Sequence, residues 1–226
     1  MVNLQQLLTR PTFGPLEVLS YLWPDVELYD KQREMVLSVR DSVETIVVAG
    51  NQLGKDFVAG YICLSFFLWP MLYFSPKYVA EVESFRTPKN DPHTRRIITT
   101  SVASYHLAVL WAEIGWWART CKQDLFSGSE AILMLDKQIR FVQESGVEDE
   151  RNLRNYMKGQ VSAKGEGMAG HHAMYTLGVV DEASGMDDEV YDRFRGWTKR
   201  RLLFGNPEAC ENRFKEHYKA GDLLAV

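Results

Sequence analysis

Residues 45–56 place the strongest constraint on the fold of this chain. The β-branched run Thr45–Val48 precedes the small-residue loop Ala49–Gly54, and Lys55 then opens an apolar stretch. β-Branched residues favour strands. Phosphate binding requires backbone N–H groups that approach closely, the positive dipole end of a helix, and one mobile ammonium group. The segment therefore predicts a strand–loop–helix unit that binds the phosphates of a nucleotide.

The predicted loop departs from the usual Walker A pattern at two positions. That pattern is Gly, four residues, Gly–Lys and then Ser or Thr. Here Ala49 stands at the first glycine, and Asp56 stands at the hydroxyl that binds the metal. The remaining glycines still leave backbone room around the phosphates. We therefore expect phosphate contacts from Gly50, Asn51, Gln52, Leu53, Gly54, Lys55 and Asp56.

Length and composition indicate one globular unit. With 226 residues, 46% of them hydrophobic, the chain can bury a substantial core. We expect a helical N-terminal arm over residues 1–28 and a single domain over residues 29–226. The formal net charge of −4 argues against nucleic-acid binding by bulk charge. Local basic patches at residues 95–96, 151–158 and 199–201 remain, although each alone is typical of a solvated surface.

The sequence favours an intracellular protein without a membrane span. Met1–Arg10 lacks the basic start and the apolar core of a signal peptide. The apolar stretch 57–73 is interrupted by Gly60, Ser65 and Pro70, which favours a buried helix. The three cysteines are widely spaced and fit a reducing compartment.

Strands and helices are predicted to alternate along the chain. The expected strands are 45–48, 96–100, 156–162, 175–180 and 201–204, with a hairpin over 131–142. The expected helices are 30–41, 55–69, one containing Leu107 to Trp117, 187–197 and 211–220, and residues 76–94 are expected to be a polar loop. This alternation predicts an α/β fold with a mostly parallel sheet flanked by helices on both faces. Ligands of such sheets bind at the carboxyl ends of the strands.

An acidic pair follows one of these strands. The apolar run Leu177–Val180 leads into Asp181 and Glu182. Asp181 is predicted to hold Mg²⁺, directly or through water, and Glu182 to polarise the attacking water and accept its proton. A solvated acidic turn is the alternative for the pair alone, but the preceding phosphate loop favours the Walker B interpretation.

Three further residues are candidate nucleotide contacts. Asn206 ends a predicted strand, where its amide can hydrogen-bond the γ-phosphate or its water. The amide of Gln32 can pair with the edge of adenine while the ring of Tyr29 packs on its face. An ordinary turn and two ligand-free surface residues are the alternative interpretations.

Together these motifs resemble the ATPase domain of the large terminase subunit of tailed bacteriophages. The resemblance rests on Gln32, on Gly50–Lys55, on Val180–Ala183 and on Gly205–Pro207, and it includes the glycine-containing segment Gly165–His171. It extends from about residue 29 to the end of the chain. The resemblance implies a P-loop ATPase of RecA-like fold that uses ATP and Mg²⁺ to drive double-stranded DNA into a capsid.

The same resemblance implies the remaining properties. Lys55 would neutralise phosphate charge, and Gly205–Pro207 would couple hydrolysis to movement. The implied partners are double-stranded viral DNA, the portal protein and the small terminase subunit, in a ring of copies at the portal. The implied location is the cytoplasm of the infected bacterial host. Members of the family carry a nuclease domain after this point, which we expect to be absent from this chain.

Two departures from the family pattern leave alternatives open. Asp56 would either contact Mg²⁺ or favour the helix N-terminus instead. Family members often place an arginine where Asn51 or Ala169 stands here, so Arg151, Arg154, Arg193 and Arg195 are the remaining candidates for an arginine finger. The alternative functions are a helicase-like DNA-dependent ATPase and a nucleotide-binding switch or assembly module with little turnover.

Overall fold

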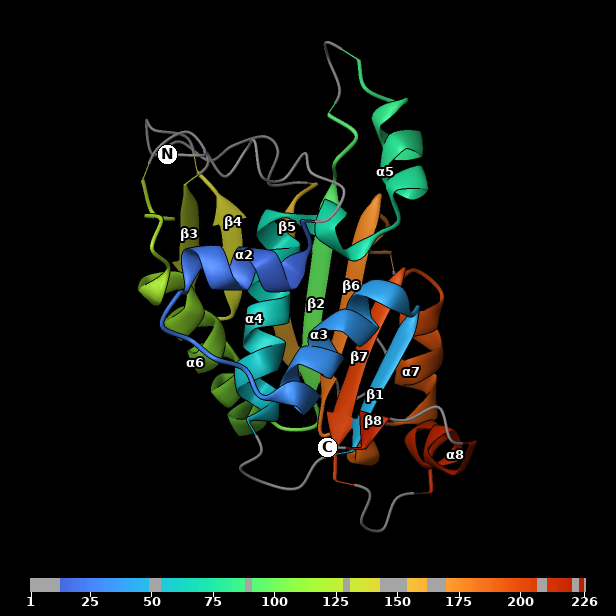
Figure 1. Cartoon of the computed structure of the whole chain (residues 1–226). Helices are drawn as coiled ribbons and strands as arrows, with labels where there is room; N and C mark the ends of the chain where they lie inside the picture. Colours follow the sequence, from blue (N-terminus) through green and yellow to red (C-terminus); the bar gives the residue numbers. More distant parts are fainter. Residues whose placement is uncertain are drawn as a thin grey trace.

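An eight-stranded sheet forms the centre of the computed structural model, with the strand order β3-β4-β5-β2-β6-β7-β1-β8 (Figure 1). The structure describes residues 13–48, 54–87, 91–127, 131–142, 154–161, 170–206, 211–220 and 224–225. The strands are β1 (Glu44–Val48), β2 (Arg95–Ser101), β3 (Ile132–Leu135), β4 (Gln138–Phe141), β5 (Tyr156–Val161), β6 (Tyr175–Asp181), β7 (Arg200–Gly205) and β8 (Leu224–Ala225). The six strands from β5 to β8 in this order are mutually parallel, and β4 runs antiparallel to both of its neighbours, β3 and β5.

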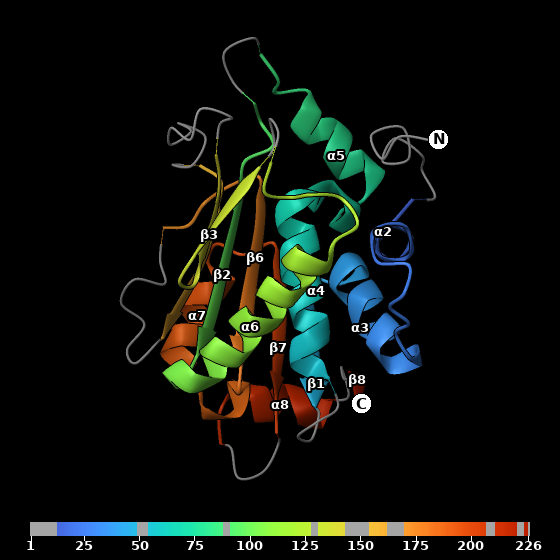
Figure 2. The same cartoon turned by 90° about the vertical axis from the view of Figure 1, so that its left-hand side faces the viewer.

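Helices cover both faces of this sheet (Figures 1 and 2). One face packs against α3 (Asp30–Asp41), α4 (Lys55–Leu68) and α6 (Ser104–Thr120), with α2 (Pro15–Leu22) packed on α3, and the other face packs against α7 (Asp188–Arg195) and α8 (Arg213–Ala220). A hydrophobic core lies on each face of the sheet, and successive residues of a strand belong to the two cores alternately. Val179 belongs to the core on the first face and Val180 to the core on the second. The predicted α/β class with a mostly parallel sheet is therefore confirmed.

Most helices begin and end close to the predicted residues. In α3 the apolar positions Met35, Val36 and Val39 are buried as their spacing predicts. In α4 almost every residue is buried, because the helix lies between the sheet, α3 and α6. No helix among the described residues is long and apolar enough to cross a membrane.

The expectation of a polar loop over residues 76–94 is wrong for residues 76–83. Residues Pro70–Tyr73 form the 3-10 helix η1, and Pro76–Glu83 form the helix α5. The Ser75 hydroxyl accepts the Tyr78 amide at 3.3 Å, and Pro76 occupies the first helical position. Only Val82 of α5 is buried and the helix has only eight residues, so its apolar pattern is short.

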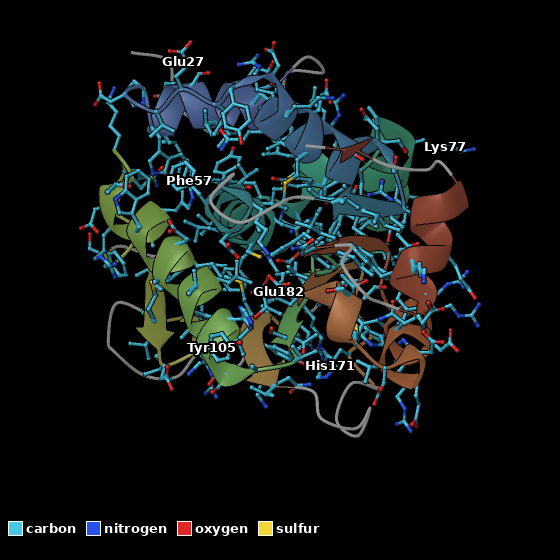
Figure 3. All side chains as sticks on the ribbon, turned by 90° about the horizontal axis from the view of Figure 1, so that it is seen from below. Glu27, Phe57, Lys77, Tyr105, His171 and Glu182 are labelled. Atoms are coloured by element: carbon cyan, nitrogen blue, oxygen red, sulfur yellow. The ribbon has the colours of Figure 1, made fainter. Side chains whose placement is uncertain are left out.

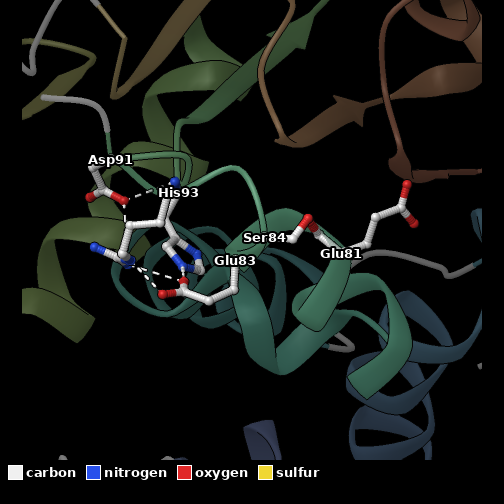
Figure 4. Close-up of polar contacts among 6 residues, drawn as sticks. Glu81, Glu83, Ser84, Asp91 and His93 are labelled. Atoms are coloured by element: carbon white, nitrogen blue, oxygen red, sulfur yellow. Dashed lines mark hydrogen bonds and ion pairs between the residues drawn. The ribbon is translucent and has the colours of Figure 1, made fainter. Parts of the chain in front are cut away.

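A polar cluster fastens the end of α5 to the chain before β2 (Figure 4). The Nε2 atom of His93 lies 2.6 Å from Oε2 of Glu83, and Arg86 also hydrogen-bonds the Glu83 carboxylate. The backbone N–H of His93 donates to Asp91 at 3.0 Å. Hydrogen bonds from Arg86 and then His93 lower the pKa of Glu83 to about 2. The cluster lies at the end of the sheet opposite the start of α4 (Figure 1).

Several arginines of the predicted basic patches serve the fold. Arg95 donates from Nη1 to the last carbonyls of α4, at 2.9 and 2.8 Å. Arg200 donates to carbonyls of Arg40 and Tyr73. Arg201 forms an ion pair of 2.6 Å with Glu44 inside the protein. These side chains satisfy helix ends and a buried carboxylate, so they do not form an exposed stripe for a polyanion.

Within the N-terminal arm, residues Pro15–Leu22 form the helix α2. Val18 and Leu19 of α2 belong to the same hydrophobic core as α4 and α6. The Trp23 indole N–H donates to the Trp117 carbonyl at 3.0 Å, which joins the arm to α6.

Candidate active site

The carboxyl ends of β1, β6 and β7 meet at one edge of the sheet. Val48 pairs with Gly205 and Asp181 pairs with Phe204, so the three motif-bearing turns begin side by side. Figure 3 looks onto this edge, with Glu182 near the middle. The strand ends that precede these turns therefore lie together at one edge of the sheet.

Lys55 enters this edge from the first residue of α4. Gly54 precedes it as the N-cap with φ 71° and ψ 22°, a left-handed conformation that favours glycine. Residues 49–53, and with them the predicted contacts of Gly50, Asn51, Gln52 and Leu53, lie outside the described residues. The Lys55 side chain is buried, with 8% of the residue exposed.

The ammonium group of Lys55 lies between two carboxylates. Its Nζ atom donates to Oε1 of Glu182 at 2.5 Å and lies 3.6 Å from Oδ1 of Asp181. Its remaining side is covered by the Phe204 ring, whose centroid is 5.4 Å away. Burial lowers the pKa of Lys55, but the hydrogen bond to Glu182 and the charges of both carboxylates outweigh this effect and raise it.

Glu182 adopts a backbone conformation that few residues other than glycine take. Its φ is 52° and its ψ 48°, and the 3-10 helix η3 (Ala183–Gly185) follows directly. Such a conformation persists only where the surroundings enforce it. Its effect is to turn the chain at the end of β6, so that the carboxylate reaches Lys55.

Two residues of the β7–α8 connection enforce that turn. A Cβ added to Gly205 would lie 3.0 Å from the backbone N of Ala183, so glycine allows the close approach of β7. The Nδ2 atom of Asn212 donates to the carbonyls of Ala183, Ser184 and Met186 at 3.1, 3.0 and 2.8 Å. Asn212 was not predicted from the sequence. An asparagine before a helix signals an N-cap, but the partners of its amide are distant in sequence.

Asp181 is 2% exposed, and its Oδ1 atom has no hydrogen-bond partner within the part of the chain that the structure describes. Burial, followed by the negative charge of Asp56, raises the pKa of Asp181 to about 7, while Lys55 opposes the shift. A buried carboxylate oxygen without a hydrogen bond is expected to have a ligand. Mg²⁺ binds through one or two carboxylates together with waters and phosphates, and this site fits that requirement.

Asp56 lies in the first turn of α4, where its charge is favourable to the helix dipole. Burial raises the pKa of Asp56, Lys55 opposes this effect, and Glu182 adds to it. Asp56 in turn adds to the effect of burial in raising the pKa of Glu113 on α6. No group of three or more potential metal ligands of the His, Cys, Asp or Glu type exists among the described residues.

The two predicted adenine contacts lie in different surroundings. Gln32 is 9% exposed, and a Cβ added to Gly54 would lie 2.7 Å from its Nε2 atom, so its amide adjoins the start of α4. Tyr29 is the half-exposed N-cap of α3, three residues earlier. Their contacts with adenine stay predictions.

The other predicted residues are placed less specifically. Asn206 directly follows β7 at the same edge, and Pro207 lies outside the described residues. Among the candidate arginines, Arg193 forms a 2.6 Å ion pair with Glu189 on α7, and Arg195 lies over the Tyr191 ring. Arg154 lies two residues before the start of β5. Arg151 and the segment 165–169 lie outside the described residues.

Comparison with known proteins supports the fold. No protein-family model and no curated protein sequence matches this chain. Its structure is similar to the crystal structure of the HK97 bacteriophage large terminase, with a TM-score of 0.51 and 12% sequence identity. The match covers 94% of this chain and 43% of that one, so this chain spans less than half the length of the terminase. The predicted resemblance is thereby confirmed at the level of the fold.

Proposed function

We propose that this chain is the ATP-hydrolysing motor domain of a DNA-packaging terminase. The observation that supports this most strongly is the convergence of Lys55, Asp181 and Glu182 at the carboxyl edge of the sheet. The similar fold of a bacteriophage large terminase supports the same proposal. Residues 29–226 would form the motor domain, with residues 1–28 as an arm packed on it.

Each residue of the site has a role that its surroundings support. Lys55 would leave Glu182 and pair with the β- and γ-phosphates of ATP, because its ammonium is the cation at the start of α4. Glu182, released from Lys55, would orient the attacking water and accept its proton. Asp181, and Asp56 directly or through water, would hold Mg²⁺, which when bound neutralises charge on the phosphates.

The coupling of hydrolysis to movement would use the β7–α8 connection. Asn206 would contact the γ-phosphate or its water, and Gly205 lies against the turn that bears Glu182. Through Asn212 the same turn is hydrogen-bonded to the start of α8. Loss of the γ-phosphate would therefore be transmitted to α8 through these hydrogen-bonded groups.

The proposed partners follow from the proposed motor function. They are double-stranded viral DNA, the portal protein and the small terminase subunit, with copies of this chain assembled as a ring on the portal. The proposed location is the cytoplasm of the infected bacterial host. The arginine finger would come from Arg151, Arg154, Arg193 or Arg195, or from a neighbouring copy.

A nucleotide-dependent switch is the second candidate. Its support is the Lys55–Glu182 pair, since a nucleotide that binds without releasing Glu182 would leave no free base for hydrolysis. Such a switch would bind ATP with an affinity similar to that of the proposed motor, but it would hydrolyse little of it.

The deciding experiment is ATP turnover by the full chain, with and without DNA and with portal-bound assemblies. We expect Glu182→Gln to bind ATP and to lose turnover by about 10²–10⁴-fold, the usual contribution of a general base. Glu81→Gln, which removes an exposed carboxylate on α5, serves as the matched control and should keep wild-type turnover. Tight ATP binding with negligible turnover of the wild type in all conditions would favour the switch.

A further inference from the structure

Ser101 ends strand β2 beside the acidic pair, in a row of residues that crosses three strands. In the parallel register Ser101 pairs with Asp181, and Asp181 pairs with Phe204. Neighbouring strands lie about 4.8 Å apart, and paired residues of parallel strands point to the same face of the sheet. Ser101 therefore lies next to Asp181, on the side away from Phe204.

This row faces the layer that contains Lys55. Thr99, two residues before Ser101, accepts a hydrogen bond of 2.9 Å from the Trp111 indole of α6. Because side chains alternate along a strand, Ser101 points to the same face as Thr99. The helices α4 and α6 lie on that face, and α4 supplies Lys55.

Two buried polar atoms of this row have no hydrogen bond among the described residues. Ser101 and Asp181 are each 2% exposed. Neither Oγ of Ser101 nor Oδ1 of Asp181 has a hydrogen-bond partner among the residues that the structure describes. Buried hydroxyl and carboxylate oxygens are rarely left unpaired in native proteins, so two side by side indicate a shared polar ligand.

We propose that Ser101 is a ligand of the divalent cation site at Asp181, to which its hydroxyl oxygen binds directly or through a cation-bound water. This inference rests on the proposed nucleotide site. The phosphate loop has Asp56 where a Ser or Thr hydroxyl usually reaches the metal, so the site lacks its usual neutral oxygen. Ser101 supplies one without adding charge where Asp56, Asp181 and Glu182 already interact electrostatically.

Thr100 provides a matched control on the same strand. Its Oγ1 atom is also buried without a hydrogen-bond partner within the described part of the chain. It points to the opposite face, however, where its strand neighbour Val180 belongs to an apolar core. Removal of the Thr100 hydroxyl should therefore leave cation binding unchanged.

The test measures the affinity of a non-hydrolysable ATP analogue by calorimetry, with Mg²⁺ and with EDTA. For Ser101→Ala we expect the Mg²⁺-dependent gain in affinity to fall by about tenfold, in the range known for groups that support a metal site. The affinity in EDTA should not change. Thr100→Val should retain the full Mg²⁺-dependent gain. Asp56→Thr, placed in the Ser101→Ala background, should restore the gain by returning a hydroxyl to the loop.

The outcomes separate this inference from the proposed function. An unchanged Mg²⁺-dependent gain in Ser101→Ala, with normal ATP binding by the wild type, overturns the role of Ser101 and leaves the ATPase proposal standing. Absence of ATP binding by the wild type overturns both. Circular dichroism in EDTA checks that Ser101→Ala folds. If it does not fold, Ser101→Cys, which keeps the size but replaces the hard oxygen, should show the same loss of Mg²⁺-dependent affinity.

Discussion

The Nζ atom of Lys55 donates to Oε1 of Glu182 at 2.5 Å, although 127 positions separate the two residues in the sequence. Lys55 begins α4, and Glu182 follows β6 in a left-handed conformation. The contact pairs the predicted phosphate-binding cation with the predicted general base. In the proposed function, the phosphates of ATP and Glu182 would therefore compete for one ammonium group.

Glu182→Gln should separate ATP binding from turnover. The neutral amide holds Lys55 less strongly than the carboxylate, so we expect ATP affinity to stay equal or to rise by a few-fold while turnover falls. Equilibrium binding of a fluorescent ATP analogue and steady-state turnover measure the two effects. A parallel loss of affinity and turnover would contradict the competition between Glu182 and the phosphates.

Asp181 should make the nucleotide-free protein less stable as the pH rises. Its pKa is raised from 3.8 to about 7 by folding. Below pH 4 both states are protonated and Asp181 has no effect. Between pH 4 and 7 the unfolded state ionises while the folded state keeps its proton, so folding becomes less favourable. We therefore compare the free energy of unfolding of Asp181→Asn with that of the wild type. We expect the advantage of the variant to be about 2 kcal/mol larger at pH 8 than at pH 5.

Chemical denaturation in EDTA at the two pH values measures this difference. Asp136→Asn, in the exposed turn of the β3–β4 hairpin, is the control and should show little difference between them. Equal effects of Asp181→Asn at both pH values would mean that Asp181 is ionised in the folded protein throughout.

Asn212→Ala should lower turnover through the position of Glu182. The substitution removes three hydrogen bonds to the turn after β6 and should cost about 1–3 kcal/mol of stability. We expect the fold-change in kcat to exceed the fold-change in KM, because the substitution does not alter the proposed phosphate contacts of Lys55. Glu216→Gln, one turn later on α8, should leave kcat unchanged. A rise in KM alone would contradict the positioning role.

Gly205→Ala should destabilise the same turn by steric conflict. The added Cβ would lie 3.0 Å from the backbone N of Ala183 and 3.3 Å from that of Ser184. Backbone atoms in a packed turn cannot easily move away from it. We expect a loss of about 1–3 kcal/mol. Gly196→Ala is the control, because its Cβ would lie 3.4 Å from the Arg193 carbonyl in an ordinary helical conformation. Urea unfolding of both variants tests the difference.

Local signals in the sequence determined most of the elements and the edge at which the motifs meet. The apolar spacing in α3 and the β-branched run of β1 act over a few residues, so their physical causes are visible in the chain itself. The helix α5 was missed although Ser75 and Pro76 are helix-start signals, because it has only eight residues and buries only Val82, so its apolar pattern is short. Strand β8 has only two residues, and it exists because it pairs with β1.

Only the tertiary structure decided how the site residues meet. The parallel order of β2, β6 and β7 brings Ser101 beside Asp181, and the close approach at Gly205 brings Asn212 to the turn after Glu182. These relationships depend on strand order and on side-chain burial, which no local pattern encodes. The sequence by itself determined which residues are candidates for phosphate binding and for acidic chemistry. The packing of the sheet determined their partners, because a buried ammonium or carboxylate must pair with whichever charged group the fold places beside it.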